Sequence, residues 1–273
     1  MSVYQELRKL QNIEDAYERW SDYRAVMTDY MISSTDCDSS LAIFGAGACN
    51  DIDLCRLISH FSSITLFDSN KAALQQAVAR YALSDYNGIH LCVCDLVGIT
   101  DSDYEDYAAT LTEQLQLFKN AIEPQLLNSM AAASLHQLYE RIRPYQLTLG
   151  KNAFDYSAAF GLHSQLNNMT SWIYHAITDP LSYTDASVDR LIASYNPPII
   201  KKVNDTIISA TRKAVLFSNE LECTASKGPI AGAMDCILDI KERYPSCEKA
   251  VINWPFDVAG NRTYKMLLQK VLL

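Results

Sequence analysis

Three short apolar runs alternate with polar, helix-like stretches in the first third of the chain. The runs cover residues 41–44, 64–67 and 89–94, and they end at Gly45, Asp68 and Asp95. The stretch after the first run favours a helix, and residues 70–83 predict another, capped by Ser69 or Asn70. Strands that alternate with helices in this way predict an α/β fold with a doubly wound parallel sheet.

Apolar residues at three- and four-residue steps predict helices over residues 1–32, before a polar loop at 33–40. Residues 101–150 interrupt the alternation with two or three amphipathic helices, roughly at 104–121 and 124–141. This insertion is too long for an ordinary crossover between strands. We therefore expect an N-terminal helical cap (1–39), a core (40–100 and 151–273) and a helical insertion (101–150) that forms part of the cap.

The second half of the chain returns to the alternating pattern. It predicts strands at 156–160 and 214–218, helices at 164–177, 187–194 and 199–212, a loop and helix at 228–240, and two final strands at 249–254 and 264–271 around a turn at 257–262. Asn196-Pro197-Pro198 predicts a break between two of these helices, because proline lacks a backbone N–H.

Composition narrows the class of protein. With 273 residues, 49% hydrophobic and 20% charged, the chain fits one large globular domain or a domain with a cap. A net charge of −9 disfavours binding to long nucleic acid or to an anionic membrane. The first residues show no secretory apolar segment, so we expect a cytoplasmic protein whose eight cysteines are reduced and mostly buried. No histidine or cysteine spacing is typical of a metal site.

The strand ends carry residue types that suit a nucleotide-like ligand. Gly45 and Gly47 permit positive φ angles and a close approach of backbone to ligand. Asp68 can accept hydrogen bonds from both hydroxyls of a ribose, although it can also cap the following helix. No nucleophile elbow or lysine-containing phosphate loop occurs.

These features resemble the class I S-adenosylmethionine-dependent methyltransferases. The resemblance rests on Gly45-Ala46-Gly47, Asp68, Cys94-Asp95-Leu96 and residues 154–166, and it covers about residues 40–99 and 154–273. It implies a Rossmann-like seven-stranded sheet that closes with an antiparallel pair, and S-adenosyl-L-methionine as cofactor.

By this resemblance the residues from 45 to 47 would line the methionine part of the cofactor, Asp68 with Ser69 would bind the ribose, and Asp95 with Leu96 would lie by the adenine. The sequence departs from the family at Ile43, often an acid there, and at Cys49, in place of a third glycine.

Further candidates surround these positions. Asn50 and Asp51 are expected at the start of the first core helix, where either could hold the ammonium of the methionine part or simply favour the helix end. In an aromatic stripe near the N-terminus, Tyr23 and Arg24 are candidates for the cofactor carboxylate and Tyr30 for the substrate; core packing is the alternative.

Polar residues after two later strands are the substrate candidates. His163 and Gln165 follow the fourth strand, and Glu220 and Glu222 are expected after the fifth. His163 has a pKa suited to a general base, but it is equally explained as a structural histidine. Either glutamate could bind a cationic substrate, or both could be exposed loop acids. His163 and Glu220 are thus the weak catalytic candidates.

The sequence favours a methyltransferase that acts on a small molecule or a peptide side chain, as a monomer or homodimer. The first alternative is an NAD(P)-dependent oxidoreductase, against which stands Asn50 where its third glycine would be. The second is a catalytically degenerate methyltransferase fold that serves as an interaction protein.

Overall fold

The computed structural model describes residues 2–10, 13, 15–117, 122–225, 228–257 and 260–273. Within these ranges the chain divides into two compact units. The helical unit contains residues 1–14, 97–146 and 165–199, and the sheet unit contains residues 15–96, 147–164 and 200–273. Residues 15–39, expected in the cap, cluster with the sheet, and residues 165–199, expected in the core, cluster with the helices.

The sheet unit is built on seven strands in the order β3-β2-β1-β4-β5-β7-β6. The strands are β1 (Ser39–Phe44), β2 (Phe61–Asp68), β3 (Ile89–Val93), β4 (Phe154–Phe160), β5 (Thr211–Cys223), β6 (Glu248–Asp257) and β7 (Arg262–Leu272). Strands β1 to β5 pair in parallel, whereas β7 pairs antiparallel with both β5 and β6. The predicted α/β sheet and its closing antiparallel pair are confirmed; residues 258 and 259 of the predicted turn lie outside the described residues.

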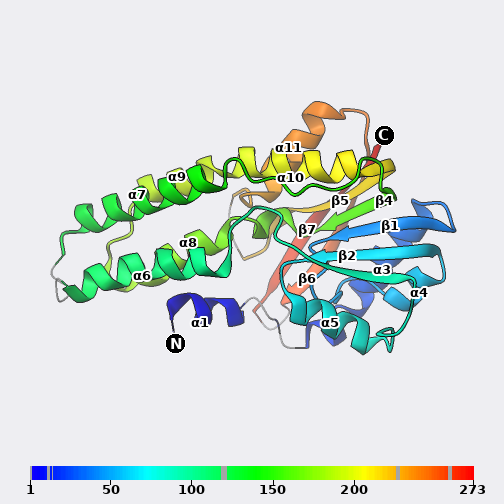
Figure 1. The fold of residues 1–273 in the computed structure, drawn as a ribbon, viewed down its shortest axis with the longest axis horizontal. Helices are drawn as coiled ribbons and strands as arrows, with labels where there is room; N and C mark the ends of the chain where they lie inside the picture. The colour runs from blue at the N-terminus through cyan, green and yellow to red at the C-terminus, as the bar shows by residue number, and fades with distance from the viewer. Residues whose placement is uncertain (1, 11–12, 14, 118–121, 226–227, 258–259) are drawn as a thin grey trace. The chain divides into compact units, whose positions relative to one another are not determined.

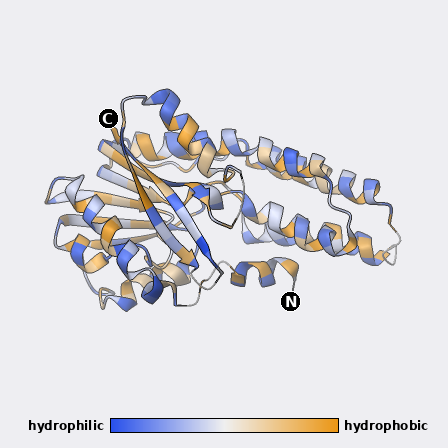
Figure 2. Ribbon diagram, turned by 180° about the vertical axis from the view of Figure 1, so that it is seen from behind, coloured by the Kyte–Doolittle hydropathy of each residue, from blue (hydrophilic) through white to orange (hydrophobic). Residues whose placement is uncertain are grey.

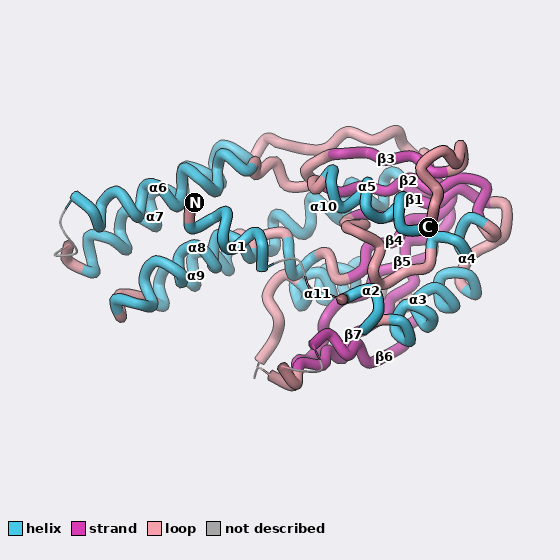
Figure 3. Tube along the Cα trace, turned by 90° about the horizontal axis from the view of Figure 1, so that it is seen from below, coloured by secondary structure: helices cyan, strands magenta, loops and turns pink. Residues whose placement is uncertain are grey.

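Helices flank both faces of this sheet (Figures 1 and 3). They are α2 (Ala16–Arg19), α3 (Ser21–Ser33), α4 (Leu54–Ile58), α5 (Lys71–Arg80), α10 (Asn196–Ala210) and α11 (Ala233–Arg243). Figure 1 shows α4 and α5 below the sheet and α10 and α11 above it. Asn70 is the cap of α5, since its Oδ1 accepts a hydrogen bond from the N–H of Ala73 at 3.1 Å.

The core lies on the central strands, which are buried almost throughout. In β1 and β4 nearly every residue is buried, because helices cover both faces. Phe44 and Phe67 stack with ring centroids 4.6 Å apart across β1 and β2. The strand β3 is at the edge, and its Leu91 and Val93 are exposed. The central strands therefore form a rigid base that fixes where the strand ends lie.

Two predicted boundaries are wrong for identifiable reasons. The predicted break between two helices is present at Tyr195, but Pro197 and Pro198 lie in the first turn of α10 rather than before it, because a missing N–H there has no intrahelical partner to lose. Strand β5 continues to Cys223 rather than ending near Ser218, because it pairs with β7 from Ala214 to Cys223.

The helical unit contains α1 (Val3–Leu10), α6 (Asp101–Leu117), α7 (Pro124–Ile142), α8 (Asn168–Thr178) and α9 (Ala186–Ser194), with short 3-10 turns at His163–Gln165, shared with the sheet unit, and at Asp179–Leu181. Hydrophilic and hydrophobic residues alternate along the longer helices, as Figure 2 shows. Residues 11–12 and 14 of the predicted N-terminal helices and 118–121 of the predicted insertion lie outside the described residues.

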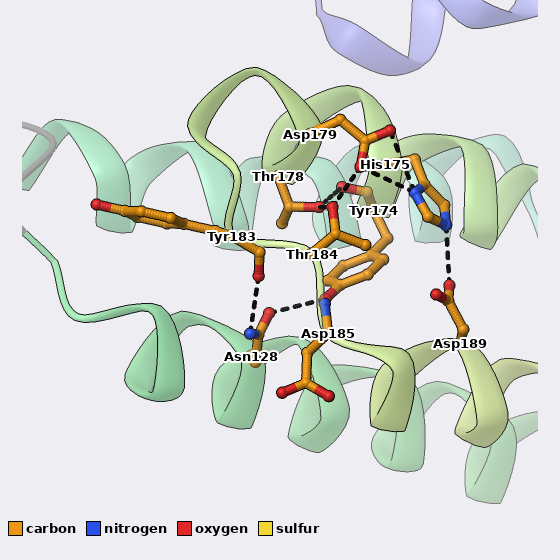
Figure 4. A network of polar contacts seen from close by, with 9 residues as sticks. All are labelled: Asn128, Tyr174, His175, Thr178, Asp179, Tyr183, Thr184, Asp185 and Asp189. Carbon is orange, nitrogen blue, oxygen red and sulfur yellow. Dashed lines mark hydrogen bonds and ion pairs between the residues drawn. The ribbon is translucent and has the colours of Figure 1, made fainter.

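A polar network joins α7, α8 and α9 (Figure 4). Buried Tyr174 donates a hydrogen bond to Asn128 at 2.8 Å and accepts one from the N–H of Asp185 at 2.7 Å. His175 contacts Asp179 at 3.1 Å and Asp189 at 2.8 Å through its two ring nitrogens. The network fixes the ends of two helices against each other within this unit.

In the part of the chain that the structure describes, no helix has the length and apolarity needed to span a membrane.

Candidate functional site

The glycine turn after β1 lies where the strand order reverses. The chain runs from β1 toward β2 and β3 on one side, and β4 and β5 lie on the other. Gly45 and Gly47 have φ angles of +71° and +50°, as predicted. The N–H of Gly45 donates to the carbonyl of Phe67 at 2.8 Å. A Cβ at residue 45 would lie 2.7 Å from Cδ1 of Leu162, whereas one at residue 47 would meet no atom within 4 Å. Ligands of open α/β sheets bind at such a crevice.

Asp68 ties this turn to the next strand. Its Oδ2 accepts from the N–H of Gly47 at 2.8 Å, and its Oδ1 accepts from the N–H of Asn70 at 2.7 Å. A carboxylate has about four acceptor positions, so two remain for other donors. Ser69 beside it is exposed. Asp68 therefore holds the turn and retains the capacity to accept hydroxyl hydrogens.

The third strand delivers its terminal residues to the same edge. The N–H of Cys94 donates to the carbonyl of Asp68 at 3.0 Å, just beyond the end of β3. Asp95 and Leu96 follow, both half-buried. The structure thus brings together the ends of the first three strands.

Of the eight thiols, only Cys49 and Cys236 are buried and two are exposed, which differs from the expectation of mostly buried cysteines.

Two arginines hold the loop that follows the glycine turn. Their guanidinium carbons lie 3.7 Å (Arg24) and 4.3 Å (Arg80) from the ring centroid of Tyr17. Nη1 of Arg24 donates to the carbonyl of Asn50 at 3.0 Å, and Nη1 of Arg80 donates to the carbonyl of Ala48 at 2.9 Å and to Oδ1 of Asn50 at 2.7 Å. Arg24 therefore binds the loop backbone and positions it. Arg80 was not a candidate from the sequence, because a cation in the last turn of a helix is already favourable there.

The first core helix begins later than expected. Asp53 is the cap of α4, accepting from the N–H of Arg56 at 3.3 Å, so Asn50 and Asp51 precede the helix. Asp51 is half-buried. Burial raises the pKa of Asp51 to about 6, although a hydrogen bond from its own backbone and the charge of Arg24 act in the opposite direction. Asp51 is thus an acceptor near the turn whose charged form is only weakly stabilised.

Aromatic rings close the neighbouring region at β5 and β6. Tyr23 stacks on Trp254 with centroids 5.0 Å apart and an interplanar angle of 11°. Burial raises the pKa of Tyr23, and the charges of Asp51 and Glu220 raise it further. Tyr23 therefore lies near both carboxyl groups. Trp254 was not a candidate from the sequence, because an aromatic residue in a predicted strand is already accounted for by packing in the sheet.

Glu220 and Glu222 lie within β5 rather than after it, and their surroundings differ. Glu220 is 3% exposed, and its Oε1 accepts from the hydroxyl of Ser164 at 2.8 Å. Burial raises the pKa of Glu220. Glu222 is exposed and pairs with Lys265 at 3.6 Å. Only Glu220 joins the site, because Glu222 is a solvated surface acid.

His163 is a buried structural residue. It is 1% exposed, and its Nδ1 and Nε2 each lie 2.9 Å from an amide oxygen, of Asn219 and Asn204 respectively. Burial lowers the pKa of His163 to about 4. With both ring nitrogens engaged by side chains of the core, His163 has no free nitrogen to act as a general base, so this weak catalytic candidate is not supported.

Another substrate candidate, Tyr30, does not join the site. Tyr30 lies at the far end of α3, where the charge of Glu248 at the start of β6 helps burial to raise its pKa. Since β6 runs parallel to β1, this is the edge opposite the glycine turn. Gln165 belongs to the helical unit and accepts from Asn168 at 2.8 Å.

Solved structures similar to this chain include several methyltransferases. The N-methyltransferase NodS from Bradyrhizobium japonicum WM9, in complex with S-adenosyl-L-homocysteine, is 13% identical, with 98% of each chain covered and a TM-score of 0.45. A SAM-dependent methyltransferase from Aquifex aeolicus is 8% identical, with 98% of each chain covered and a TM-score of 0.43.

Phosphoethanolamine N-methyltransferase 1 of Haemonchus contortus, in complex with phosphoethanolamine and S-adenosylhomocysteine, is 10% identical; 93% of this chain and 44% of that chain are covered, with a TM-score of 0.44. No protein-family model matches the chain, and no curated protein matches its sequence.

Proposed function

We propose that this protein is an S-adenosyl-L-methionine-dependent methyltransferase that acts on a small molecule or a peptide side chain. One observation carries the proposal. The glycine turn after β1 lies at the reversal of strand order and is hydrogen-bonded, through Gly47, to the carboxylate of Asp68 at the end of β2. A bare backbone beside a carboxylate at this position suits a ligand that carries a ribose.

The residues present fit the cofactor. The open space beside Gly47 admits a ligand against the backbone. Asp68 keeps two acceptor positions for ribose hydroxyls, and Asp51 lies in the loop where the ammonium of the methionine part would need an anion. Asp95 and Leu96 lie beyond β3, where the adenine would bind. When bound, the cofactor supplies an activated methyl group, and the work of this chain is to align donor and acceptor and to exclude water.

The alternatives account for fewer features. A dinucleotide-binding fold has strand order 3-2-1-4-5-6, whereas here the antiparallel β7 separates β5 from β6. Asn50 also replaces the third glycine of the dinucleotide motif. A catalytically degenerate interaction protein would not need the buried carboxyl of Glu220 beside Gly161, where an added Cβ would lie 3.7 Å from Oε1. We therefore favour an active enzyme.

The test compares two ligands and one variant. S-adenosylhomocysteine should raise the melting temperature of the protein, and NADH should not. In Asp68→Ala the affinity for S-adenosylhomocysteine, measured by calorimetry, should fall about tenfold or more, because hydrogen bonds to a charged acceptor contribute about 1.5–3 kcal/mol. The exposed turn acid Asp85 provides the control Asp85→Ala, which should bind normally.

Each result has a distinct meaning. A melting temperature unmoved by S-adenosylhomocysteine would reject the methyltransferase. Unchanged affinity in Asp68→Ala would reject only the ribose assignment. A rise in melting temperature with NADH alone would favour the oxidoreductase.

A further inference from the structure

One carboxylate oxygen of Glu220 is buried without a donor. The side chain is 3% exposed, and Oε1 accepts from Ser164 at 2.8 Å. Within the described ranges, Oε2 has no hydrogen-bond partner, although it is shielded from solvent. Leaving a buried acceptor unsatisfied is unfavourable, and for a charged group the penalty is larger. An oxygen in this position is typical of a binding site whose donor is a ligand.

The surroundings of Glu220 place this oxygen near the edge of the sheet that carries the glycine turn. Gly161 follows β4 and has a φ angle of +57°, and a Cβ added there would lie 3.7 Å from Oε1 of Glu220. Gly161 and Ser164 are only half-buried, so the edge of the site is reached from solvent. Among the residues that the structure describes, Tyr23 on α3 and Tyr264 on β7 are titratable groups that face Glu220, and neither is a cation.

We propose that the free Oε2 of Glu220 binds the amino group of the methyl acceptor, so that the substrate is a primary or secondary amine. An amine, protonated in water, offers an N–H donor and a compensating positive charge, and it passes one proton to Oε2 before its lone pair accepts the methyl group. The proposal rests on the proposed function in taking the ligand as the methyl acceptor. The two carboxyl groups therefore have different ligands. Glu220 binds the methyl acceptor, and Asp51, in the loop next to the glycine turn, is assigned to the cofactor.

Burial explains why Glu220 discriminates strongly between an amine and a neutral alcohol. A carboxylate that is removed from water loses its solvation, and only a ligand with a compensating charge restores it. Glu222, two residues along the same strand, is exposed and already paired with Lys265. It therefore offers a matched control: the same residue type on the same strand, without the buried, unpartnered oxygen.

The experiment uses the full chain, saturated with S-adenosylhomocysteine. The probes are n-butylamine and ethanolamine, each compared with its alcohol counterpart, 1-butanol and ethylene glycol, and a lysine-containing peptide compared with the same peptide carrying norleucine. Binding is followed by ligand-observed NMR. In the wild type at least one amine should bind about tenfold or more tightly than its neutral counterpart. Glu220→Gln should lose this preference, and Glu222→Gln should keep it.

A separate titration with S-adenosylhomocysteine checks that the variants fold and tests the cofactor site. Glu220→Gln should bind it with wild-type affinity. Weaker S-adenosylhomocysteine binding in Glu220→Gln alone would assign the carboxylate to the cofactor and overturn the proposal. So would equal binding of amines and alcohols, no binding of any amine by the wild type, or an amine preference that survives Glu220→Gln. If the wild type failed to bind S-adenosylhomocysteine while its amine preference persisted, the proposed function alone would fail.

Discussion

Replacing Asp51 by asparagine should stabilise the free protein and weaken its cofactor binding. Asp51 is half-buried in the loop after Gly47. Burial raises its pKa from 3.8 to about 6, because Arg24 and its own backbone N–H only partly compensate the lost solvation. Asparagine has nearly the same shape and carries no charge, so it removes the penalty and keeps one acceptor oxygen.

The sign and size of the effect follow from proton linkage. The folded protein binds the Asp51 proton more tightly than the unfolded chain does, so the free energy of unfolding falls as pH rises from about 4 to about 6. The shift corresponds to an upper limit of about 3 kcal/mol above that window. Because the side chain is half-buried, water screens part of this charge, and we expect about 1–2 kcal/mol at pH 7.

Urea unfolding of wild type and Asp51→Asn at about pH 4.5, 5.5 and 7.5 measures this difference. The variant should gain stability relative to wild type as pH rises, while Asp85→Asn, at an exposed turn, should show a constant difference. At about pH 7.5 the variant's affinity for S-adenosylhomocysteine should fall about tenfold, because the ammonium loses its charged partner. A stability difference that is independent of pH, or a variant less stable at pH 7, would refute the reasoning.

Two further predictions concern packing and the helical unit. Gly45→Ala should lower the free energy of unfolding by about 2–4 kcal/mol, because it combines a positive φ with a Cβ 2.7 Å from Leu162. Gly47→Ala has open space beside it and should lower the free energy of unfolding by about 1–2 kcal/mol. Equal losses of the two variants in urea unfolding would contradict this account. Burial lowers the pKa of His175, but its bonds to Asp179 and Asp189 have the larger effect and raise it. The contribution of His175 to the stability of the folded protein is therefore greatest below its usual pKa and is lost as pH rises through its pKa in the folded protein. His175→Gln should therefore lose about 0.2–1 kcal/mol at about pH 5.5 and less at about pH 8.5, and a larger loss at the higher pH would show the sign to be wrong.

The strand ends were predictable because their signals are local. Gly45, Asp68 and Asp95 each follow directly after an apolar run, and parallel strands bring such residues to one edge of the sheet. The cap at Asn70 could be predicted for the same reason, since a capping side chain bonds to a backbone three residues away. The confirmed sheet therefore rests on short-range patterns.

What the sequence did not predict depends on contacts between distant segments. Asn219 and Glu220 look like loop residues, yet β5 continues through them because β7 pairs with it there. The stack of Tyr23 on Trp254 joins residues more than two hundred positions apart, and no local pattern announces it. Whether a polar side chain is buried, as Glu220 is, or solvated, as Glu222 is, depends on such packing.

The predicted cap over the site remains a prediction, as do the roles given to Asp95 and Leu96.

The surroundings of His163 impose a direction on the hydrogen bonds of the core. A neutral imidazole carries one proton, so it donates through one nitrogen and accepts through the other. The amide nitrogen of Asn204 is committed to Asp239 at 2.8 Å, which leaves its oxygen for Nε2 and makes that nitrogen the donor. Nδ1 then carries no proton, so it can accept a hydrogen bond only if the amide of Asn219 turns to present its Nδ2 in place of the Oδ1 that lies 2.9 Å from Nδ1. The orientation of the Asn204 amide therefore determines the tautomer of His163, which in turn determines the orientation of the Asn219 amide. These three side chains come from α10, the loop after β4 and β5, and the direction of one of their hydrogen bonds can reverse only if the others reverse too.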